Sequence, residues 1–185
     1  MQPAGARDPV AEPFADCYRL EWHPDPLTPR TYPRGRFRFD APSGEFPVIY
    51  TADNESACFA EVFGDKRLIE VVDGDRRLFR LSATRSLRLL QLDDGAVSMS
   101  FNLDARICTI KPYRRTQLWS RAFHRWFPDL DGLRYVPRHA TGKTNYCLYL
   151  DRCGADLDAT DLGRLASLPD AVDRALAAYP LASLL

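Results

Sequence analysis

The residues best suited to chemistry are arginines that could bind phosphate. Only three of the 25 Lys and Arg residues are lysines: Lys66, Lys111 and Lys143. A planar guanidinium group pairs with phosphate through two parallel hydrogen bonds, so this bias favours phosphate recognition. An arginine-favouring genome explains the same bias more simply, and composition alone does not separate the two causes.

Particular positions are more informative, because a group of polar residues surrounds the segment 47–64. Tyr50 ends an apolar run of β-branched residues, and Glu61 lies on the helical pattern that follows. Arg36 precedes Tyr50, and Arg19 lies in the first apolar segment of the chain. Spacing alone favours surface salt bridges and an ordinary buried tyrosine over a site.

Other familiar motifs fail on inspection. The triplet Gly142-Lys143-Thr144 resembles the end of a phosphate-binding loop, but Pro137 stands where the motif needs its first glycine. The triplet also precedes a predicted strand rather than a helix. The cysteines and histidines lack the spacing of a zinc site. Cys/His and Ser/His catalysis stays formally open, although no G-x-S-x-G elbow supports it.

Composition excludes several classes of protein. A chain of 185 residues suits one domain, and its 25 acidic and 25 basic residues argue against a generic nucleic-acid binder. No apolar run reaches the ~18–20 residues of a membrane helix, and residues 1–13 lack the apolar stretch of a signal peptide. We therefore expect a cytoplasmic protein with no membrane partner and no direct nucleic-acid partner. Its five cysteines are expected to be free thiols, and Cys58, Cys108 and Cys147 are expected to be small core residues.

The elements that must position these residues follow from periodicity and from turn signals. Residues 1–15 are expected to be a flexible lead-in, and residues 16–185 the domain. Strands are predicted at 17–22, 35–39, 47–52, 77–83, 86–92, 132–136 and 145–151. Helices are predicted at 55–64, 116–127 and 169–181, with a proline-broken loop at 23–33. Short strands mixed with few helices indicate a single α+β domain with a mixed, largely antiparallel sheet flanked by helices.

Several short motifs, in the right order, resemble the RES domain family. The central ones are Gly35-Arg36-Phe37, Ile49-Tyr50-Thr51-Ala52 and Ala60-Glu61. Upstream, Tyr18-Arg19 is similar to the family's first-strand arginine. Downstream, residues 131–152 resemble its G-(I/L)-x-Y-x-S-R segment and the strand that follows. The likeness covers Cys17 to Arg152 and the terminal helix.

The resemblance implies a fold like that of ADP-ribosyltransferase toxins and a role as the toxin of a bacterial toxin–antitoxin module. It implies cleavage of NAD+ at the nicotinamide–ribose bond, by hydrolysis or phosphorolysis. NAD+ is then a substrate, with no permanently bound cofactor and no metal. The alternatives are a protein ADP-ribosyltransferase and a catalytically inactive binding module. The implied partner is an Xre-type helix-turn-helix antitoxin whose C-terminal segment blocks the cleft; a homo-oligomer is left open.

The resemblance also assigns roles to residues. The expected catalytic residues are Glu61, Arg36 and Tyr50, and the expected NAD-binding residues are Arg19, Arg36, Tyr50, Asn145 and Arg138. The Glu61 carboxylate would stabilise the positive charge that develops on the ribose as nicotinamide leaves. Arg19 and Arg36 would bind the pyrophosphate, and Tyr50 would stack on the nicotinamide ring. Asn145 would orient the nicotinamide or the sugar.

One departure from the family pattern affects these expectations. Pro137 stands where the family commonly has serine, and proline supplies neither a hydroxyl nor a backbone N–H. Any hydrogen bond made by that serine is lost here or is taken over by Thr141 or Thr144. The substitution bears on catalytic strength and on the choice of acceptor, and it supports the inactive alternative.

Overall fold

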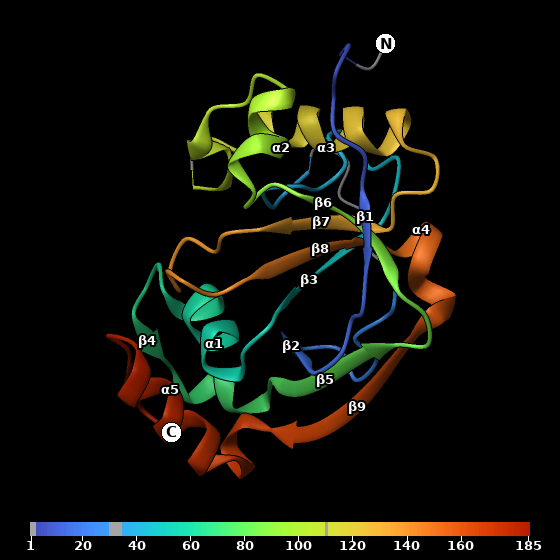
Figure 1. Ribbon diagram of the computed structural model, residues 1–185. Helices are drawn as coiled ribbons and strands as arrows, with labels where there is room; N and C mark the ends of the chain where they lie inside the picture. Colours follow the sequence, from blue (N-terminus) through green and yellow to red (C-terminus); the bar gives the residue numbers. More distant parts are fainter. Residues whose placement is uncertain (1–2, 30–34, 110) are drawn as a thin grey trace.

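The computed structural model describes residues 3–29, 35–109 and 111–185, and its main feature is one curled, eight-stranded sheet (Figure 1). In spatial order its strands are β1 (Val10–Glu12), β6 (Leu87–Gln91), β7 (Gly132–Tyr135), β8 (Asn145–Tyr149), β3 (Val48–Ala52), β2 (Cys17–Glu21), β5 (Arg77–Ala83) and β9 (Leu157–Arg164). Among these described strands, β6 and β7 are the parallel pair, and the other neighbours are antiparallel. A small second sheet joins β4 (Leu68–Ile69) to β10 (Ala182–Ser183).

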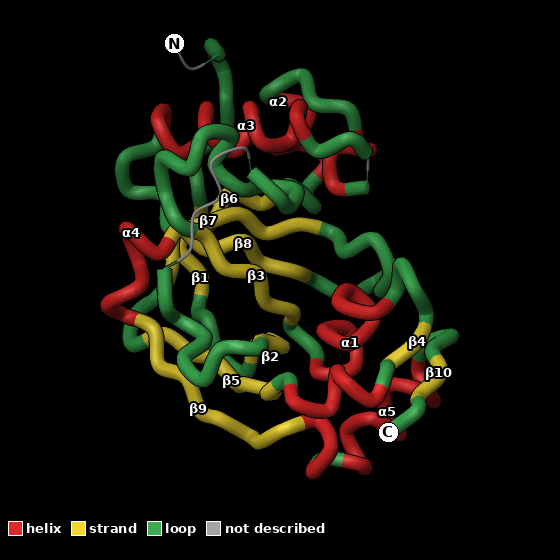
Figure 2. Tube along the Cα trace, turned by 180° about the vertical axis from the view of Figure 1, so that it is seen from behind, coloured by secondary structure: helices red, strands yellow, loops and turns green. Residues whose placement is uncertain are grey.

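The helices form two groups (Figures 1 and 2). One group contains α2 (Gly95–Ser100) and α3 (Arg114–Trp126), which lie beside β6 and β7. The other contains α1 (Glu55–Phe63) and α5 (Pro169–Ala178), which pack on each other near β4. The short helices are η1 (Val71–Asp75), η2 (Ala105–Cys108), α4 (Leu150–Cys153), η3 (Gly154–Asp156) and η4 (Leu165–Ser167). None of the helices in the described ranges is long and apolar enough to cross a membrane.

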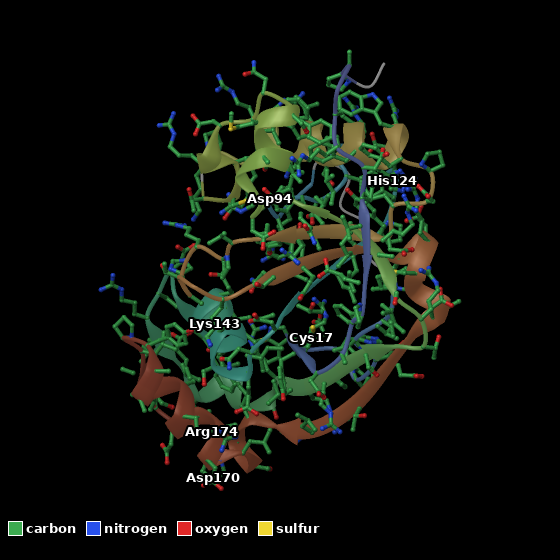
Figure 3. The ribbon with its side chains drawn as sticks, in the orientation of Figure 1. Cys17, Asp94, His124, Lys143, Asp170 and Arg174 are labelled. Atoms are coloured by element: carbon green, nitrogen blue, oxygen red, sulfur yellow. The ribbon has the colours of Figure 1, made fainter. Side chains whose placement is uncertain are left out.

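Three apolar clusters make up the core. The first lies under α2 and α3, where Phe123 is fully buried and Trp119 and Trp126 pack against it. The second lies between α1 and α5 and is centred on aromatic residues such as Phe59. The third lies among the sheet strands and includes Cys17, which is drawn inside the fold in Figure 3. The aromatic stripe of α3 is thus core packing.

Most predicted elements are confirmed, including α1, α3, α5 and the strands β2, β3, β5, β6, β7 and β8. The strand predicted at 35–39 is wrong, because this segment forms turns that are held by the carboxylate of Asp40. The expected flexible lead-in is wrong at its end, where β1 pairs with β6 and Phe14 is buried. Of the loop predicted at 23–33, residues 23–29 are loop and turn, and residues 30–33 lie outside the described residues.

The sheet opens between β2 and β3. β2 pairs along its whole length with β5, and β3 pairs along its whole length with β8. β2 and β3, however, are paired only at Tyr18 and Ala52. Near this opening the Arg19 Nη1 group donates to the carbonyl oxygen of Tyr50, at 3.0 Å. The two halves of the sheet therefore diverge where the predicted site residues lie.

Candidate active site

A cavity of about 470 Å³ lies at the opening between β2 and β3. Its size falls within the ~300–1,000 Å³ that is common for small-molecule sites. The sequence-predicted residues all line it: Arg19, Arg36, Tyr50, Glu61, Arg138 and Asn145. Arg38 and Arg76 line it as well, so five guanidinium groups from the described residues face one hollow. This concentration of fixed positive charge suits an anionic ligand.

Helix α1 brings Glu61 to the cavity. The helix begins at an Asn54 cap, whose Oδ1 accepts a hydrogen bond from the Ala57 amide at 3.1 Å. Fully buried aromatic residues on the other face of the helix fix its rotation. The Glu61 Oε1 atom accepts a hydrogen bond from the backbone N–H of His139 at 2.5 Å. Within the described part of the chain, Glu61 Oε2 has no hydrogen-bond partner, so this oxygen remains available to a ligand.

Tyr50 is held by two hydrogen bonds at its phenol. The hydroxyl donates to Asp40 Oδ1 at 2.9 Å and accepts from the Phe39 amide at 2.8 Å. Burial raises the pKa of Tyr50 well above its usual range, and the neighbouring thiol of Cys147 and carboxylate of Asp40 add to the rise. The phenol therefore stays protonated near neutral pH. Its ring lines the cavity and meets Phe37 edge-on at a centroid distance of 5.9 Å.

The turn that carries Arg36 depends on Asp40. Asp40 Oδ2 accepts hydrogen bonds from the backbone amides of Arg36 and Phe37, at 2.8 and 2.7 Å. Gly35 has φ +57°, and a Cβ atom there would lie 2.7 Å from Gln117 Nε2, so glycine is required at this position. Gln117 on α3 donates to the carbonyl of Phe37 at 2.9 Å. The turn thus presents the Arg36 side chain, which is exposed, at the cavity.

Arg19 bridges the two strands at the opening. Its Nη2 atom pairs with Glu21 Oε2 at 2.5 Å, in addition to the bond from Nη1 to the Tyr50 carbonyl. Glu21 is itself buried, with 8% of its surface exposed. A buried carboxylate needs such a partner, because removing a charge from water without one is costly. Arg19 therefore has a structural role in joining the strands as well as a place on the cavity wall.

Asn145 and Tyr135 lie opposite each other on β8 and β7. Asn145 is 3% exposed, and its Oδ1 atom lacks a hydrogen-bond partner within the described residues. Burial raises the pKa of Tyr135 well above its usual range; the Glu61 carboxylate adds to this, and a hydrogen bond with Asn145 opposes it. A buried amide oxygen without a donor costs ~1–3 kcal/mol, so this atom is a natural acceptor for a ligand N–H.

The loop after β7 carries Arg138 to the edge of the cavity. Asp65 pairs there with Arg138 Nη1 at 3.0 Å, with His139 Nε2 at 3.2 Å and with Lys111 Nζ at 2.9 Å. The hydrogen bond from Lys111, together with the charges of Arg138 and His139, lowers the pKa of Asp65 below its ordinary value. Asp65 thereby ties the loop to the end of α1, beside the bond that holds Glu61.

The loop after β7 also bears on two predictions from the sequence: the replacement of the family's serine and the role of the Gly142-Lys143-Thr144 triplet. Pro137 is buried, and the residues considered as replacements for the family's serine, Thr141 and Thr144, are not among the described residues that line the cavity. Gly142 and Lys143 lie in a turn before β8, so the triplet does not open a helix. No metal-binding group of His, Cys, Asp and Glu is found in the described ranges, and all five cysteines are buried and free.

Sequence reasoning missed three cavity residues that shape the site: Asp40, Tyr135 and Trp22. Asp40 acts on residues three and four positions before it, which is a contact of a turn that had been predicted as a strand. Tyr135 could have been found from the hairpin register, since the paired strands 132–136 and 145–151 place a tyrosine opposite Asn145. Trp22 carried no signal beyond its place at the end of a strand.

Fold and site together define a class: an α+β domain with an arginine-lined, nucleotide-sized cavity in a divided sheet. A comparison with family models matches residues 16–169 to the RES domain, and the chain belongs to this family. A chain from the crystal structure of the M. tuberculosis MbcT–MbcA toxin–antitoxin complex shares the fold, with a TM-score of 0.66 and 20% sequence identity. The similarity covers 88% of this chain and 91% of that one. A comparison with curated protein sequences found no match.

Proposed function

We propose that this chain is the toxin of a bacterial toxin–antitoxin module and that it cleaves NAD+ at the nicotinamide–ribose bond. The observation that carries the proposal is the meeting of Glu61, Tyr50, Asn145 and the cavity arginines in one hollow of about 470 Å³. Membership of the RES domain family supports it, and the toxin–antitoxin complex that contains a chain of the same fold supports the toxin role.

The positions of the residues suggest how the dinucleotide would bind. The exposed Arg36 side chain, together with Arg19 on the same cavity wall, would bind the pyrophosphate. The nicotinamide ring would lie against Tyr50. Its carboxamide N–H would donate to Asn145 Oδ1, the buried acceptor that has no partner among the described residues. This placement brings the ribose towards Glu61.

The reaction then follows from charge. As the glycosidic bond breaks, its electron pair moves to the nicotinamide nitrogen, which becomes neutral, and positive charge develops on the ribose. Glu61 stabilises this charge through Oε2, while the His139 amide holds Oε1 in place. Attack by water forms ADP-ribose and releases one proton. Attack by phosphate forms ADP-ribose phosphate instead.

The partner would be a small Xre-type helix-turn-helix antitoxin. An open cavity whose described lining includes five guanidinium groups can be closed by a segment of another protein that carries carboxylates. We propose that the C-terminal segment of the antitoxin covers the cavity in this way and excludes NAD+. The MbcT–MbcA toxin–antitoxin complex, which contains a chain of the same fold, supports an antitoxin partner in general.

The test is release of nicotinamide from NAD+ by the purified chain. Glu61→Gln keeps the size of the side chain but removes its charge, so we expect turnover to fall by about 100-fold or more, with little change in NAD+ binding. Glu55→Gln is the matched control on the same helix, because Glu55 pairs with Arg174 and is not among the described cavity residues. It should keep wild-type turnover.

The other outcomes separate the competing functions. Labelled protein with little free ADP-ribose would indicate transfer to a protein acceptor. Binding of NAD+ without release of nicotinamide would indicate an inactive module, which the buried Pro137 in place of serine would explain. Equal turnover in wild type and Glu61→Gln would contradict the mechanism.

A further inference from the structure

Trp22 is a large aromatic residue left exposed at the wall of the cavity. It follows directly after β2, lines the cavity and has 44% of its surface exposed. Scattered exposed apolar residues are ordinary, but this one is held in place. Its backbone N–H donates to Glu21 Oε1 at 2.7 Å, and the guanidinium carbon of Arg76 lies 4.4 Å from the centre of its ring.

The position of the Arg76 side chain is fixed by the buried carboxylate of Asp73. Its Nε atom donates to Asp73 Oδ1 at 3.0 Å, and Asp73 is 2% exposed. Asp73 also accepts from Lys66 Nζ at 3.0 Å and from the backbone N–H of Glu70 at 3.1 Å. The guanidinium group therefore stays against the indole, where the cation–π attraction holds the ring in one orientation. Trp22 and Arg76 form a rigid aromatic and cationic platform.

This platform lies at the other end of the cavity from Asn145. Asn145 is on β8, Tyr50 on β3, Arg19 on β2 and Arg76 directly before β5, and these four strands are consecutive in the sheet. Three strand spacings of ~4.8 Å amount to ~14 Å, and the divergence of β2 and β3 adds to this. If nicotinamide is bound at Asn145, the second base of a dinucleotide reaches β2 and β5.

We infer that Trp22 and Arg76 bind the adenine base of the substrate, with the base stacked on the exposed part of the indole. The inference rests on the proposed function, since it assigns the second half of the NAD+ molecule. It makes the enzyme selective for a dinucleotide over nicotinamide mononucleotide, which lacks the adenylate and leaves the platform empty. The free energy of base–aromatic stacking is large enough to produce this selectivity for the dinucleotide.

Binding of ADP-ribose, measured by calorimetric titration, tests the inference without any need for turnover. We expect Trp22→Ala to weaken binding about tenfold and Trp22→Phe to keep it within about threefold, because the smaller ring still stacks. Val72→Ala is the matched control for loss of an exposed apolar side chain, since Val72 is 61% exposed and is not among the described cavity residues. It should bind as wild type does. Thermal unfolding of each variant establishes that it is folded.

Kinetics provide the second measurement. With NAD+, Trp22→Ala should raise KM about tenfold and leave kcat unchanged; with nicotinamide mononucleotide, kcat/KM should equal that of wild type. Unchanged ADP-ribose affinity in Trp22→Ala, or an equal loss on both substrates, would overturn the inference. If the wild type binds ADP-ribose through Trp22 but releases no nicotinamide, the proposed reaction fails and the adenine site stands. If nicotinamide is released and Trp22→Ala is indifferent, the opposite holds.

Discussion

Asp73 is a buried carboxylate that two cations share. It is 2% exposed and pairs with Lys66 at 3.0 Å and with Arg76 at 3.0 Å. Burial disfavours its ionised form, but the hydrogen bonds from Lys66, Arg76 and the Glu70 backbone outweigh burial and lower its pKa below the ordinary 3.8. The native state therefore favours the ionised carboxylate. The stability that it contributes is fully present above pH 3.8 and is lost as the pH falls through the lower native pKa.

Asp73→Asn should lower the free energy of unfolding by about 2 kcal/mol at neutral pH. The buried amide carries no charge, so its interactions with Lys66 and Arg76 are weaker than those of the carboxylate. The difference in free energy of unfolding between the variant and the wild type should narrow as the pH falls below 3.8. There the Asp73 carboxylate of the wild type becomes protonated first in the unfolded chain and then, at lower pH, in the native state. Denaturant unfolding of both proteins between about pH 7 and about pH 3 measures this.

Asp104→Asn is the matched control for that experiment. Asp104 pairs with Arg106 at 2.6 Å and has a pKa lowered to about 2 by hydrogen bonds from Arg106, but both side chains are exposed. Exposed pairs contribute little, so the free energy of unfolding should not change measurably in the same denaturant experiment. A pH-independent loss in Asp73→Asn would refute the electrostatic explanation and leave only lost packing.

The end of α1 contacts the loop after β7 at Gly64. A Cβ atom at Gly64 would lie 2.4 Å from His139 Cγ and 2.3 Å from the carbonyl oxygen of Ala60. Gly64→Ala must therefore displace the loop whose His139 amide holds Glu61. We expect nicotinamide release to fall at least about tenfold although every side chain that would contact the substrate is retained.

Gly154→Ala is the control, since Gly154 also ends a helix in right-handed backbone, and its Cβ atom would meet nothing closer than 3.6 Å. Its stability should be unchanged or slightly higher, because alanine restricts the unfolded chain. Activity and melting temperature of the two variants are measured side by side. Wild-type activity in Gly64→Ala would show that the contact does not position Glu61.

The elements also show what the sequence could and could not predict. β5 was predicted with its correct bounds because a short run that contains Leu78, Phe79 and Leu81 ends at the turn around Thr84 and Arg85. β9 was missed because its residues are mostly polar and exposed, as an edge strand allows. The RES resemblance predicted six residues that share the cavity. Asp40 was missed because its contacts belong to a turn within a segment predicted as a strand, and Tyr135 was missed because its place in the cavity follows from pairing the two predicted strands and not from a local motif.

Each of the three core clusters contains at least one of the five cysteines. Cys108 and Cys147 belong to the cluster under α2 and α3, Cys58 to the cluster between α1 and α5, and Cys17 and Cys153 to the cluster among the strands. All five are buried and free. Burial raises the pKa of Cys58 to about 12, so native thiolate is scarce at neutral pH. Reaction of the four thiols other than Cys58, which lines the cavity, therefore requires the core to open.

If the three clusters unfold as one cooperative unit, the four thiols other than Cys58 should react with a maleimide at one common, slow rate in the native protein. Mass spectrometry of the labelled peptides gives the rate at each cysteine, and the urea-unfolded chain supplies the control in which all five react fast. ADP-ribose at about 100 times its Kd should slow these four by about 100-fold, since a ligand of the native state stabilises it by ~2.7 kcal/mol at that concentration. Early labelling of Cys17 and Cys153 alone would instead show that the cluster among the strands opens independently, and the single cooperative domain would then be the wrong description.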